Sequence, residues 1–438
     1  MYSLRYFCFT NIPSKDNWAI LYGQQKALEN GGQFYVVFNL LREFHFAPTR
    51  AFDFMLRGLQ DVKKKLDELQ IPFILLRGEV AENIPEFVTE KEIGLLICDF
   101  SPLRTAKSWV RSISKKLEDC SFHQVDAHNV IPVWIASPKQ EYAARTIRTK
   151  INKLLPTYLT EFWEPQIQAW PDALPFIPEE IDFDELINSL EDDGIPPIKN
   201  IIPGEIAARA RLDLFCTSLI KNYGERNNPN RTDSLSGLSP YLHFGHISAQ
   251  RCILKANTAP KAVKSCADSF IEECLVRREL ADNFCHYNKN YDNINCAPDW
   301  AKETLEAHRK DARKPTYSYE ILEKGKTHDD LWNACQLQMV REGKMHGYMR
   351  MYWAKKVLEW TESPEQAFEF LVKLNDTYEL DGRDPNGYTG IAWSVCGVHD
   401  QGWKERPIFG KIRYMAYDGC KKKFDVPSYV AKYCKKTK

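Results

Sequence analysis

The 438-residue sequence has no long apolar run and no net charge, since 59 basic side chains balance 59 acidic ones. A transmembrane helix needs about 20 consecutive apolar residues, and no segment of the chain reaches that length. The N-terminal sequence MYSLRYFCFTNIPSKDNW has a short apolar stretch but no basic leader before a longer one, which argues against secretion. We therefore expect a soluble protein of the cytoplasm or nucleus, without a membrane partner.

Cysteine pairs of the Cys-x-x-Cys type are also absent. The thirteen cysteines are scattered along the chain and odd in number, so neither a zinc site nor a closed disulfide framework is indicated. Free thiols in a reducing compartment are expected, and no metal site is predicted.

The zero net charge is the sum of two unequal segments. Residues 172–193 contain nine carboxylates and no Lys or Arg, whereas residues 401–438 carry eleven basic and three acidic side chains. Exposed charges farther apart than about 8 to 10 Å are screened from one another at physiological salt, so the basic segment can attract phosphate. A solvated lysine tail explains the same charges equally well.

The first third of the chain alternates short apolar runs with amphipathic stretches, which predicts a doubly wound parallel sheet. The predicted strands are 4–9, 34–38, 73–76, 94–98 and 122–125, and the predicted helices are 18–29, 50–69, 81–90 and 105–118. No Gly-x-Gly-x-x-Gly follows the first strand, so the usual dinucleotide fingerprint is absent.

The length predicts two or three domains, and the composition favours two. Residues 1–164 form the α/β domain, and residues 165–203, rich in proline and acid, are expected to be a linker. Residues 204–438 are predicted to be mainly α-helical. The helical segments expected there are 204–223, 259–287, 301–309, 327–341 and 345–361.

Four tryptophans stand in or beside the helical segments of the second domain: Trp332, Trp353, Trp360 and Trp393. Trp353 and Trp360 are seven residues apart, which places both indoles on one helix face with a rise of roughly 10 Å. This spacing suits either dense packing or the hopping of single electrons between rings, and the spacing alone favours packing.

Six segments carry a resemblance to a known family. They are DNWAILYGQQKAL (16–28), ICDFSPLR (97–104), GLSPYLHFGHIS (237–248), EECLVRRELADNFCHYN (272–288), DDLWNACQLQMVREGKMHGYMRMYWAKKVLEW (329–360) and NDTYELDGRDPNGYTGIAWSVCGVHD (375–400). In this order and spacing they resemble the class II cyclobutane pyrimidine dimer photolyases of the photolyase/cryptochrome family. The resemblance implies a carbon–carbon lyase that holds bent FAD in its helical domain and repairs UV-damaged double-stranded DNA under blue light.

The resemblance also implies roles for individual residues. Tyr223, Ser236, Leu238 and Ser239 would contact FAD, Arg350 and Asp381 would pair beside the flavin ring, and Asn375 would lie near its reactive edge. Trp353 would be nearest the flavin in a photoreduction chain, followed by Trp332 and then Trp360. These assignments depend on the matched motifs and not on spacing alone.

For DNA, the resemblance implies that Glu273 donates a hydrogen bond to the dimer from a carboxyl group shielded from water. Glu272 is the alternative, and Glu273 is preferred because it lies four residues before Arg277, where other family members have tryptophan. Arg277 would stack on a base. Met351 and Trp393 would line the dimer pocket, and Trp403 and Arg413 would meet the duplex.

Other functions remain open from the sequence. A cryptochrome-like photosensor would share the fold, FAD and tryptophans, and a (6-4) photolyase or a helical interaction protein without cofactor are weaker alternatives. The resemblance further implies that the sheet domain can hold a second, antenna chromophore such as a deazaflavin. No obligate protein partner is evident, so a monomer is expected.

Overall fold

The computed structural model describes residues 5–9, 16–168 and 179–434 of the chain. The first part is a parallel five-stranded sheet with strand order β3-β2-β1-β4-β5. Its strands are β1 (Arg5–Phe9), β2 (Gln33–Leu40), β3 (Phe73–Arg77), β4 (Ile93–Asp99) and β5 (Ser121–Val125). The doubly wound prediction is confirmed, except that Leu4 lies outside the described residues.

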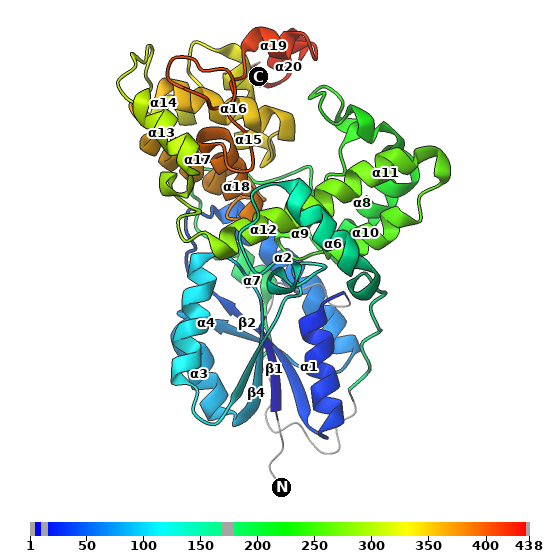
Figure 1. Ribbon diagram of the computed structural model, residues 1–438. Helices are drawn as coiled ribbons and strands as arrows, with labels where there is room; N and C mark the ends of the chain where they lie inside the picture. The colour runs from blue at the N-terminus through cyan, green and yellow to red at the C-terminus, as the bar shows by residue number, and fades with distance from the viewer. Residues whose placement is uncertain (1–4, 10–15, 169–178, 435–438) are drawn as a thin grey trace.

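Helices cover both faces of the sheet (Figure 1). They are α1 (Trp18–Glu29), α2 (Thr49–Glu68), α3 (Val80–Glu90) and α4 (Arg104–Lys116). Val36 packs with α1 and α2 on one face, and its neighbour Val37 packs with α3 and α4 on the other. Because successive strand side chains point to opposite faces and both faces are covered, β2 and β4 are almost continuously apolar, whereas the edge strand β5 (SFHQV) is largely exposed.

The rest of the chain is mainly helical, as expected. The helices are α5 (Val133–Ala136), α6 (Ala144–Tyr158), α7 (Phe183–Asn188), α8 (Glu205–Leu214), α9 (Ser239–His243), α10 (Ala249–Asn257), α11 (Lys264–Ile271), α12 (Arg278–Tyr287), α13 (Asp299–Ala307), α14 (Tyr319–Glu323), α15 (Asp330–Glu342), α16 (Gly347–Trp360), α17 (Pro364–Tyr378), α18 (Pro385–Cys396), α19 (Tyr417–Lys421) and α20 (Val426–Cys434). Among the described helices, none is long and apolar enough to cross a bilayer.

The helical part has two apolar cores, which form two lobes above the sheet in Figure 1. The first, called here the relay core, runs from Phe284 to Tyr433 and contains α15 to α18. The second, called here the lesser core, is built by α6 and α8 to α11. A site between the two cores is therefore held by elements that are distant in sequence.

Two packing details differ from the expected organisation. α6 lies in the segment assigned to the sheet domain, but its Ile147 and Ile151 pack in the lesser core. The acidic segment 165–203 contains α7, whose Phe183 and Leu186 pack against the sheet domain, while residues 169–178 of the segment lie outside the described residues. Short helices that contribute only one or two apolar side chains have too weak a period to be found from sequence.

Arg50 joins the sheet domain to the relay core. It lies on α2 and is 3% exposed. Its guanidinium donates to the carbonyls of Met339 at 3.3 Å and Val340 at 2.6 Å, and to that of Tyr378. These carbonyls are at the C-terminal ends of α15 and α17, where helix dipoles favour a cation.

We expect Arg50→Ala to lower the free energy of unfolding by about 3 kcal/mol, because it leaves buried carbonyls without a donor. Equilibrium urea unfolding measures the change. The matched control is Arg57→Ala on the same helix, whose ion pair with Asp53 at 3.0 Å is exposed, and which should change stability by no more than about 0.5 kcal/mol. Equal effects of the two substitutions would contradict the docking role of Arg50.

Candidate active site

A cluster of charged side chains lies where the two helical cores meet. Arg350 on α16 donates from Nη2 to Asp381 at 2.5 Å and to Glu379 at 2.6 Å. Lys344, just before α16, donates to Asp381 at 2.7 Å and to the hydroxyl of Ser239 at the start of α9. The cluster therefore links the relay core, which carries Arg350, to the lesser core, beside which Ser239 lies.

The charges of this cluster set one another's titration. Burial works to raise the pKa of Asp381, but Arg350 and Lys344 hold it well below its usual range. Burial raises the pKa of Glu379 to about 7, although Arg350 opposes that rise. Two cations therefore face two carboxyl groups in this cluster, and Asp381 stays ionised at neutral pH because its pKa is held low.

Three of the expected cofactor-contact residues, Ser236, Leu238 and Ser239, lie at the start of α9, whereas Tyr223 packs in the lesser core against Phe215 and Phe270. Gly237 has a φ of +68°, and a Cβ there would lie 2.9 Å from Nε of Arg211, so the backbone needs glycine. The carbonyl of Ser236 accepts a hydrogen bond from the same Nε at 2.6 Å. Leu238 is 1% exposed and its side chain packs in the lesser core. Only the backbone of Leu238 is therefore offered to a ligand.

Asn375 is placed next to this cluster by the last turn of α17. Its carbonyl accepts a hydrogen bond from the Glu379 amide at 2.9 Å, and its Nδ2 donates to Asp376 at 2.9 Å. A Cβ at Gly387 would come within 2.9 Å of that Nδ2, so glycine allows α18 to approach. Asn375 is thus one turn from Glu379, the carboxyl group that accepts from Arg350, and its place at a flavin edge stays a prediction.

The three relay tryptophans are in contact, with Trp332 between the other two. The ring centroids of Trp332 and Trp353 are 6.4 Å apart with planes inclined by 11°, and those of Trp332 and Trp360 are 5.8 Å apart. The Trp332 indole N–H donates to the Trp353 carbonyl at 3.0 Å. The order inferred from the resemblance matches this geometry.

Trp360 is at the far end of the series but is itself only 2% exposed. Tyr317 lies against it with ring centroids 5.7 Å apart, and the exposed His328 lies at 5.0 Å. The Tyr317 hydroxyl and His328 Nδ1 are hydrogen bonded at 2.7 Å. The relay therefore reaches solvent through further rings and not through an exposed Trp360.

Glu272 and Glu273 begin a π-helical turn, Glu272–Arg277, between α11 and α12. Such single turns occur frequently at functional sites because they redirect side chains. Glu272 is held by Arg148 at 2.6 Å and by Arg277 at 3.3 Å. The Arg277 guanidinium is thus partly engaged, although its side chain remains half exposed.

Glu273 has a more open environment than Glu272. Its carboxylate is 3.5 Å from Arg226, and its side chain is 45% exposed. It lies near Tyr223, whose pKa is raised by burial and by the charge of Glu273. The carboxyl group expected to be shielded from water is therefore not shielded in this structure. The reason is that the π turn leaves Glu273 facing outward, while Glu272 forms the ion pairs with Arg148 and Arg277, which are themselves partly exposed.

Of the residues expected to face DNA, Arg277 lies apart, in the π turn beside Glu272. Trp393, Trp403 and Arg413 form a second group, and Met351 of α16 packs against the relay core. Trp393 on α18 is partly exposed, and the Arg413 guanidinium lies 5.8 Å from its ring centroid. Arg413 also lies 4.6 Å from the ring of Trp403, which is 43% exposed. Lys355, a turn after Met351, lies 4.5 Å from the Trp393 ring. Flat rings and cations are therefore adjacent here, a combination that suits nucleic acid.

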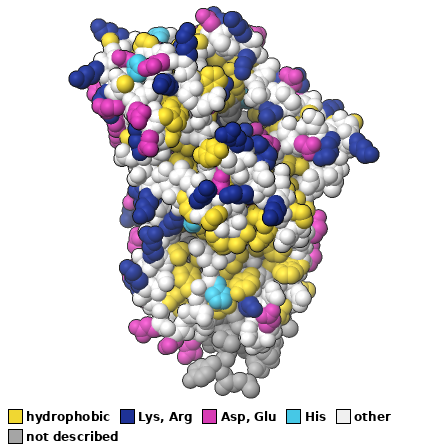
Figure 2. All heavy atoms as spheres, viewed as in Figure 1, with side chains coloured by type: hydrophobic (Ala, Val, Ile, Leu, Met, Phe, Trp, Pro, Cys, Tyr) yellow, Lys and Arg dark blue, Asp and Glu magenta, His cyan; other side chains and the backbone are white. Residues whose placement is uncertain are grey.

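The basic C-terminal segment lies on the same side of the fold. Its eight basic side chains up to residue 434 are all exposed: Lys404, Arg406, Lys411, Arg413, Lys421, Lys422, Lys423 and Lys432. The last three lysines lie outside the described residues. Figure 2 shows Lys and Arg side chains over the upper, helical half of the molecule.

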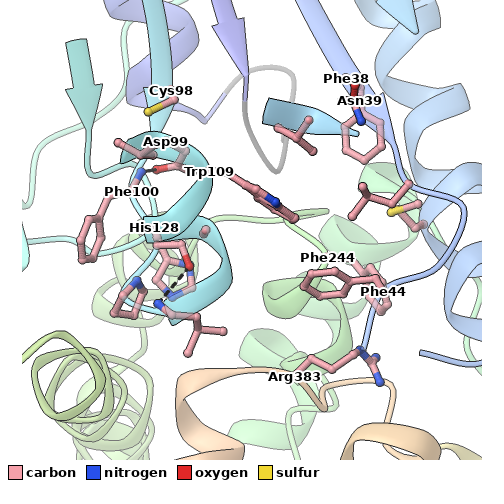
Figure 3. A pocket seen from close by; sticks show the side chains of 18 of the residues that line it. Phe38, Asn39, Phe44, Cys98, Asp99, Phe100, Trp109, His128, Phe244 and Arg383 are labelled. Atoms are coloured by element: carbon pink, nitrogen blue, oxygen red, sulfur yellow. Dashed lines mark hydrogen bonds between the residues drawn. The ribbon is translucent and has the colours of Figure 1, made fainter. Parts of the chain in front are cut away.

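A separate cavity of about 280 Å³ lies at the carboxyl ends of β2 and β4, between the sheet and the helical part. Its lining is mainly apolar and aromatic. In Figure 3, Trp109 of α4 lies near the middle, with Phe38 on one side, Asp99 on another, and Phe244 and Arg383 below. In doubly wound sheets, ligands bind at this edge where the strand order reverses.

Known proteins resemble the chain over nearly its full length. A model of the DNA photolyase family matches residues 14–171. A deoxyribodipyrimidine photo-lyase of Arabidopsis thaliana is 51% identical over 97% of this chain and 88% of its own. One from Potorous tridactylus is 50% identical over 95% of this chain and 79% of its own.

The chain belongs to the DNA photolyase family.

Solved structures of this fold include a Synechocystis cryptochrome, with a TM-score of 0.76 and 15% identity over 99% of this chain and 89% of its own. Another is a Sulfolobus tokodaii photolyase described with two FAD molecules, with a TM-score of 0.71 and 14% identity over 98% of this chain and 90% of its own. At these identities the likeness concerns the fold alone.

Membership of the photolyase family implies a flavin cofactor, and the charged cluster fits one. Lys344 and Arg350 offer cations, Ser239 offers a hydroxyl at a helix start, and Gly237 allows close backbone approach. In the described part of the chain, no group of His, Cys, Asp and Glu could hold a metal ion. The twelve cysteines from Cys98 to Cys434 are unpaired.

Several residues of the site were missed from sequence: Lys344, Glu379, Lys355, Arg226 and Arg148. Lysine and glutamate are usually exposed, so single ones in helical segments carry no signal. Lys344, Lys355 and Glu379 stand inside the matched segments 329–360 and 375–400, so these motifs could have indicated them. Arg226 and Arg148 lie outside all six segments.

Proposed function

We propose that this protein is a light-dependent enzyme that splits cyclobutane pyrimidine dimers in DNA by electron transfer from reduced FAD. The observation that carries the proposal is the near full-length match, at 50 to 51% identity, to two proteins named deoxyribodipyrimidine photo-lyase. The charged cluster, the tryptophan series and the ring-and-cation group support it, since each offers a component the reaction requires.

Lys344, Arg350 and Ser239 would hold reduced FAD, and the light-excited cofactor would supply one electron to the dimer and regain it once the two cyclobutane bonds have broken. The net reaction consumes no electron. The chain must therefore favour the negative reduced ring, hold the extruded dimer near it and keep water away. Arg350 and Lys344 serve the first need, because fixed cations stabilise a neighbouring anion.

The dimer is held by the residues of the second group and by Glu273. A dimer leaves the duplex at a cost of a few kcal/mol for unstacking, and a damaged base costs less to extrude than an intact one. Met351 and Trp393 replace the lost stacking, and Glu273 hydrogen bonds the pyrimidine edge, with its carboxyl group covered once the lesion is seated. Arg277, Trp403, Arg413 and the basic C-terminal segment contact the duplex without reading its sequence.

A cryptochrome-like photosensor is the alternative, because a cryptochrome shares the fold. That likeness is at 15% identity, whereas the likeness to the lyases is at 50% or more. The higher identity favours repair over sensing.

The cavity beside the sheet is proposed to hold an antenna chromophore such as a deazaflavin. Its apolar walls and Trp109 suit a planar aromatic ring, and Arg383 provides a cation at one end. Arg383 is also linked to Asn375 of the candidate active site by hydrogen bonds. Its amide donates to the Asp376 carboxylate at 2.8 Å, and the same carboxylate accepts from Asn375. A second FAD is the other chromophore to test, as in the Sulfolobus tokodaii protein described with two FAD molecules.

Glu273→Ala is expected to lower the yield of blue-light repair of a thymine-dimer oligonucleotide by about tenfold, with the flavin retained, because the dimer loses its carboxyl partner. The measurement compares repair per absorbed photon with a dark control. Glu272→Ala should keep the yield, since that carboxylate is held by Arg148 and Arg277. No repair by the unmodified protein would refute the proposed function, and normal repair by Glu273→Ala would refute only the role of Glu273.

Trp360→Phe is expected to slow light-driven reduction of the oxidised flavin by at least about tenfold, because it removes the last indole in contact with Trp332. Repair by enzyme reduced beforehand should be unchanged. Absorbance of the flavin during illumination measures the rate, and Trp163→Phe, an exposed tryptophan, is the control. Loss of both activities would mean that Trp360 acts only in packing.

Ala106→Trp is expected to prevent retention of 8-hydroxy-5-deazaflavin, because Ala106 lines the cavity and the indole would fill it. The unmodified protein should retain the probe through gel filtration, with its emission quenched by energy transfer to the flavin. Ser108→Trp, on the same helix but outside the cavity lining, is the control. Equal retention by both variants would contradict the assignment, and the same test with added FAD distinguishes the two chromophores.

A further inference from the structure

Lys355 is buried beside a tryptophan that is itself partly exposed. It lies on α16, one turn after Met351, and is 0% exposed. Its Nζ lies 4.5 Å from the ring centroid of Trp393 on α18, and it donates to the carbonyl of Ser394 at 3.1 Å. The ammonium is therefore fixed between a carbonyl group and an indole ring.

No carboxylate of the described chain forms an ion pair with Lys355. Burial lowers its pKa to about 7, Asp400 counteracts this from a distance and Arg413 adds to it. Removing a cation from water without an ion-pair partner is unfavourable for folding. A methionine of similar length would fill the same space without that cost, so packing alone does not account for a lysine here.

The indole ring of Trp393 is a partner that offsets the free-energy cost of burying the Lys355 ammonium. A cation over an indole face is attracted by the ring quadrupole, and the attraction is stronger where water is excluded. Because Lys355 is wholly buried and Trp393 is partly exposed, the ammonium covers the inner part of the ring and leaves the outer part accessible. Arg413, which lies 5.8 Å from the same ring, is exposed and therefore interacts more weakly.

We propose that Lys355 is a positioning residue of the dimer pocket, whose buried ammonium holds the Trp393 ring in place as a flat wall for the extruded pyrimidines. The inference rests on the proposed function, because it needs a dimer to stack on Trp393. The Ser394 carbonyl fixes the ammonium, the ammonium fixes the ring, and the ring stacks on the lesion. Rotation of Trp393 is thereby opposed from the buried side of the ring, whereas Arg413 approaches the ring from solvent.

The test is a double-mutant cycle on DNA binding. The quantity measured is the discrimination ratio, which is the Kd for an undamaged duplex divided by the Kd for the same duplex with one thymine dimer. It is measured in the dark with the flavin-bound protein at about pH 6, where Lys355 carries its proton. Lys355→Met should lower this ratio about tenfold. In the Trp393→Leu background, the same substitution should change it by less than about twofold, because its partner is already absent.

Two further variants separate positioning from folding. Lys356→Met is the matched control: Lys356 is the next lysine of α16, lies 2.8 Å from Glu359, and its loss should leave the ratio unchanged. Lys355→Gln also lacks the cation and should lose discrimination as Lys355→Met does, so the test does not depend on one variant folding. Thermal unfolding of Lys355→Met should occur at the same or a higher temperature than that of the unmodified protein.

The outcomes are distinguishable. Unchanged discrimination in Lys355→Met or Lys355→Gln, or an equal loss in the presence and absence of Trp393, would overturn the positioning role. An unchanged ratio in Trp393→Leu alone would overturn both that role and the assignment of Trp393 to the pocket. A ratio near one for the unmodified protein would instead contradict the proposed function.

Discussion

The ion pairs that fix α16 are the constraint on which the rest of the site depends. Arg350 holds Asp381 and Glu379, and Lys344 joins the same Asp381 to Ser239 of the other core. Buried ion pairs are weak evidence for stability, since desolvation offsets their attraction. Their effect here is geometric, because they fix the rotation of α16 about its own axis, and with it the direction in which each of its side chains points.

That rotation matters because α16 presents different chemistry on each face. Arg350 points to the charged cluster, Met351 and Lys355 lie one turn apart toward α18, and Trp353 and Trp360 both contact Trp332 of α15. With 3.6 residues per turn, positions four and seven apart share a face, so a single helix can separate these groups by rotation alone. The charged cluster, the Trp393 ring and the series of three tryptophans are therefore held in one fixed relation.

The parts of the fold that could be predicted are those with a strong local pattern. β2 and β4 of the sheet were found because both faces are covered and their sequences are almost continuously apolar. α18 was not found, since Gly387 and Gly390 weaken a helical pattern, yet its start is fixed by the Asp384 side chain, which accepts from the Asn386 amide at 2.9 Å. Tertiary contact with Asn375 then requires Gly387.

The residues of the candidate site also fall into those that the sequence could predict and those that only the structure shows. Arg350, Asp381, Asn375 and the tryptophans could be named because they stand in extended motifs, and the structure brings them together. Lys344 and Lys355 could not, because lysine is normally on the surface. Only the packing of distant elements buries Lys355 and partly covers Lys344. The exposure of Glu273 could not be predicted from the sequence either. It depends on the π turn, in which Glu272 and not Glu273 forms the ion pair with Arg148.

The central claim is that α16 holds the reduced flavin and an extruded dimer close enough for direct electron transfer. Time-resolved fluorescence of the reduced, flavin-bound protein tests it most directly. A duplex with a thymine dimer is expected to shorten the excited-state lifetime of the flavin, because the dimer accepts an electron, whereas the same duplex without damage should not. Equal lifetimes with the two duplexes, at concentrations that saturate binding, would contradict direct electron transfer to the dimer.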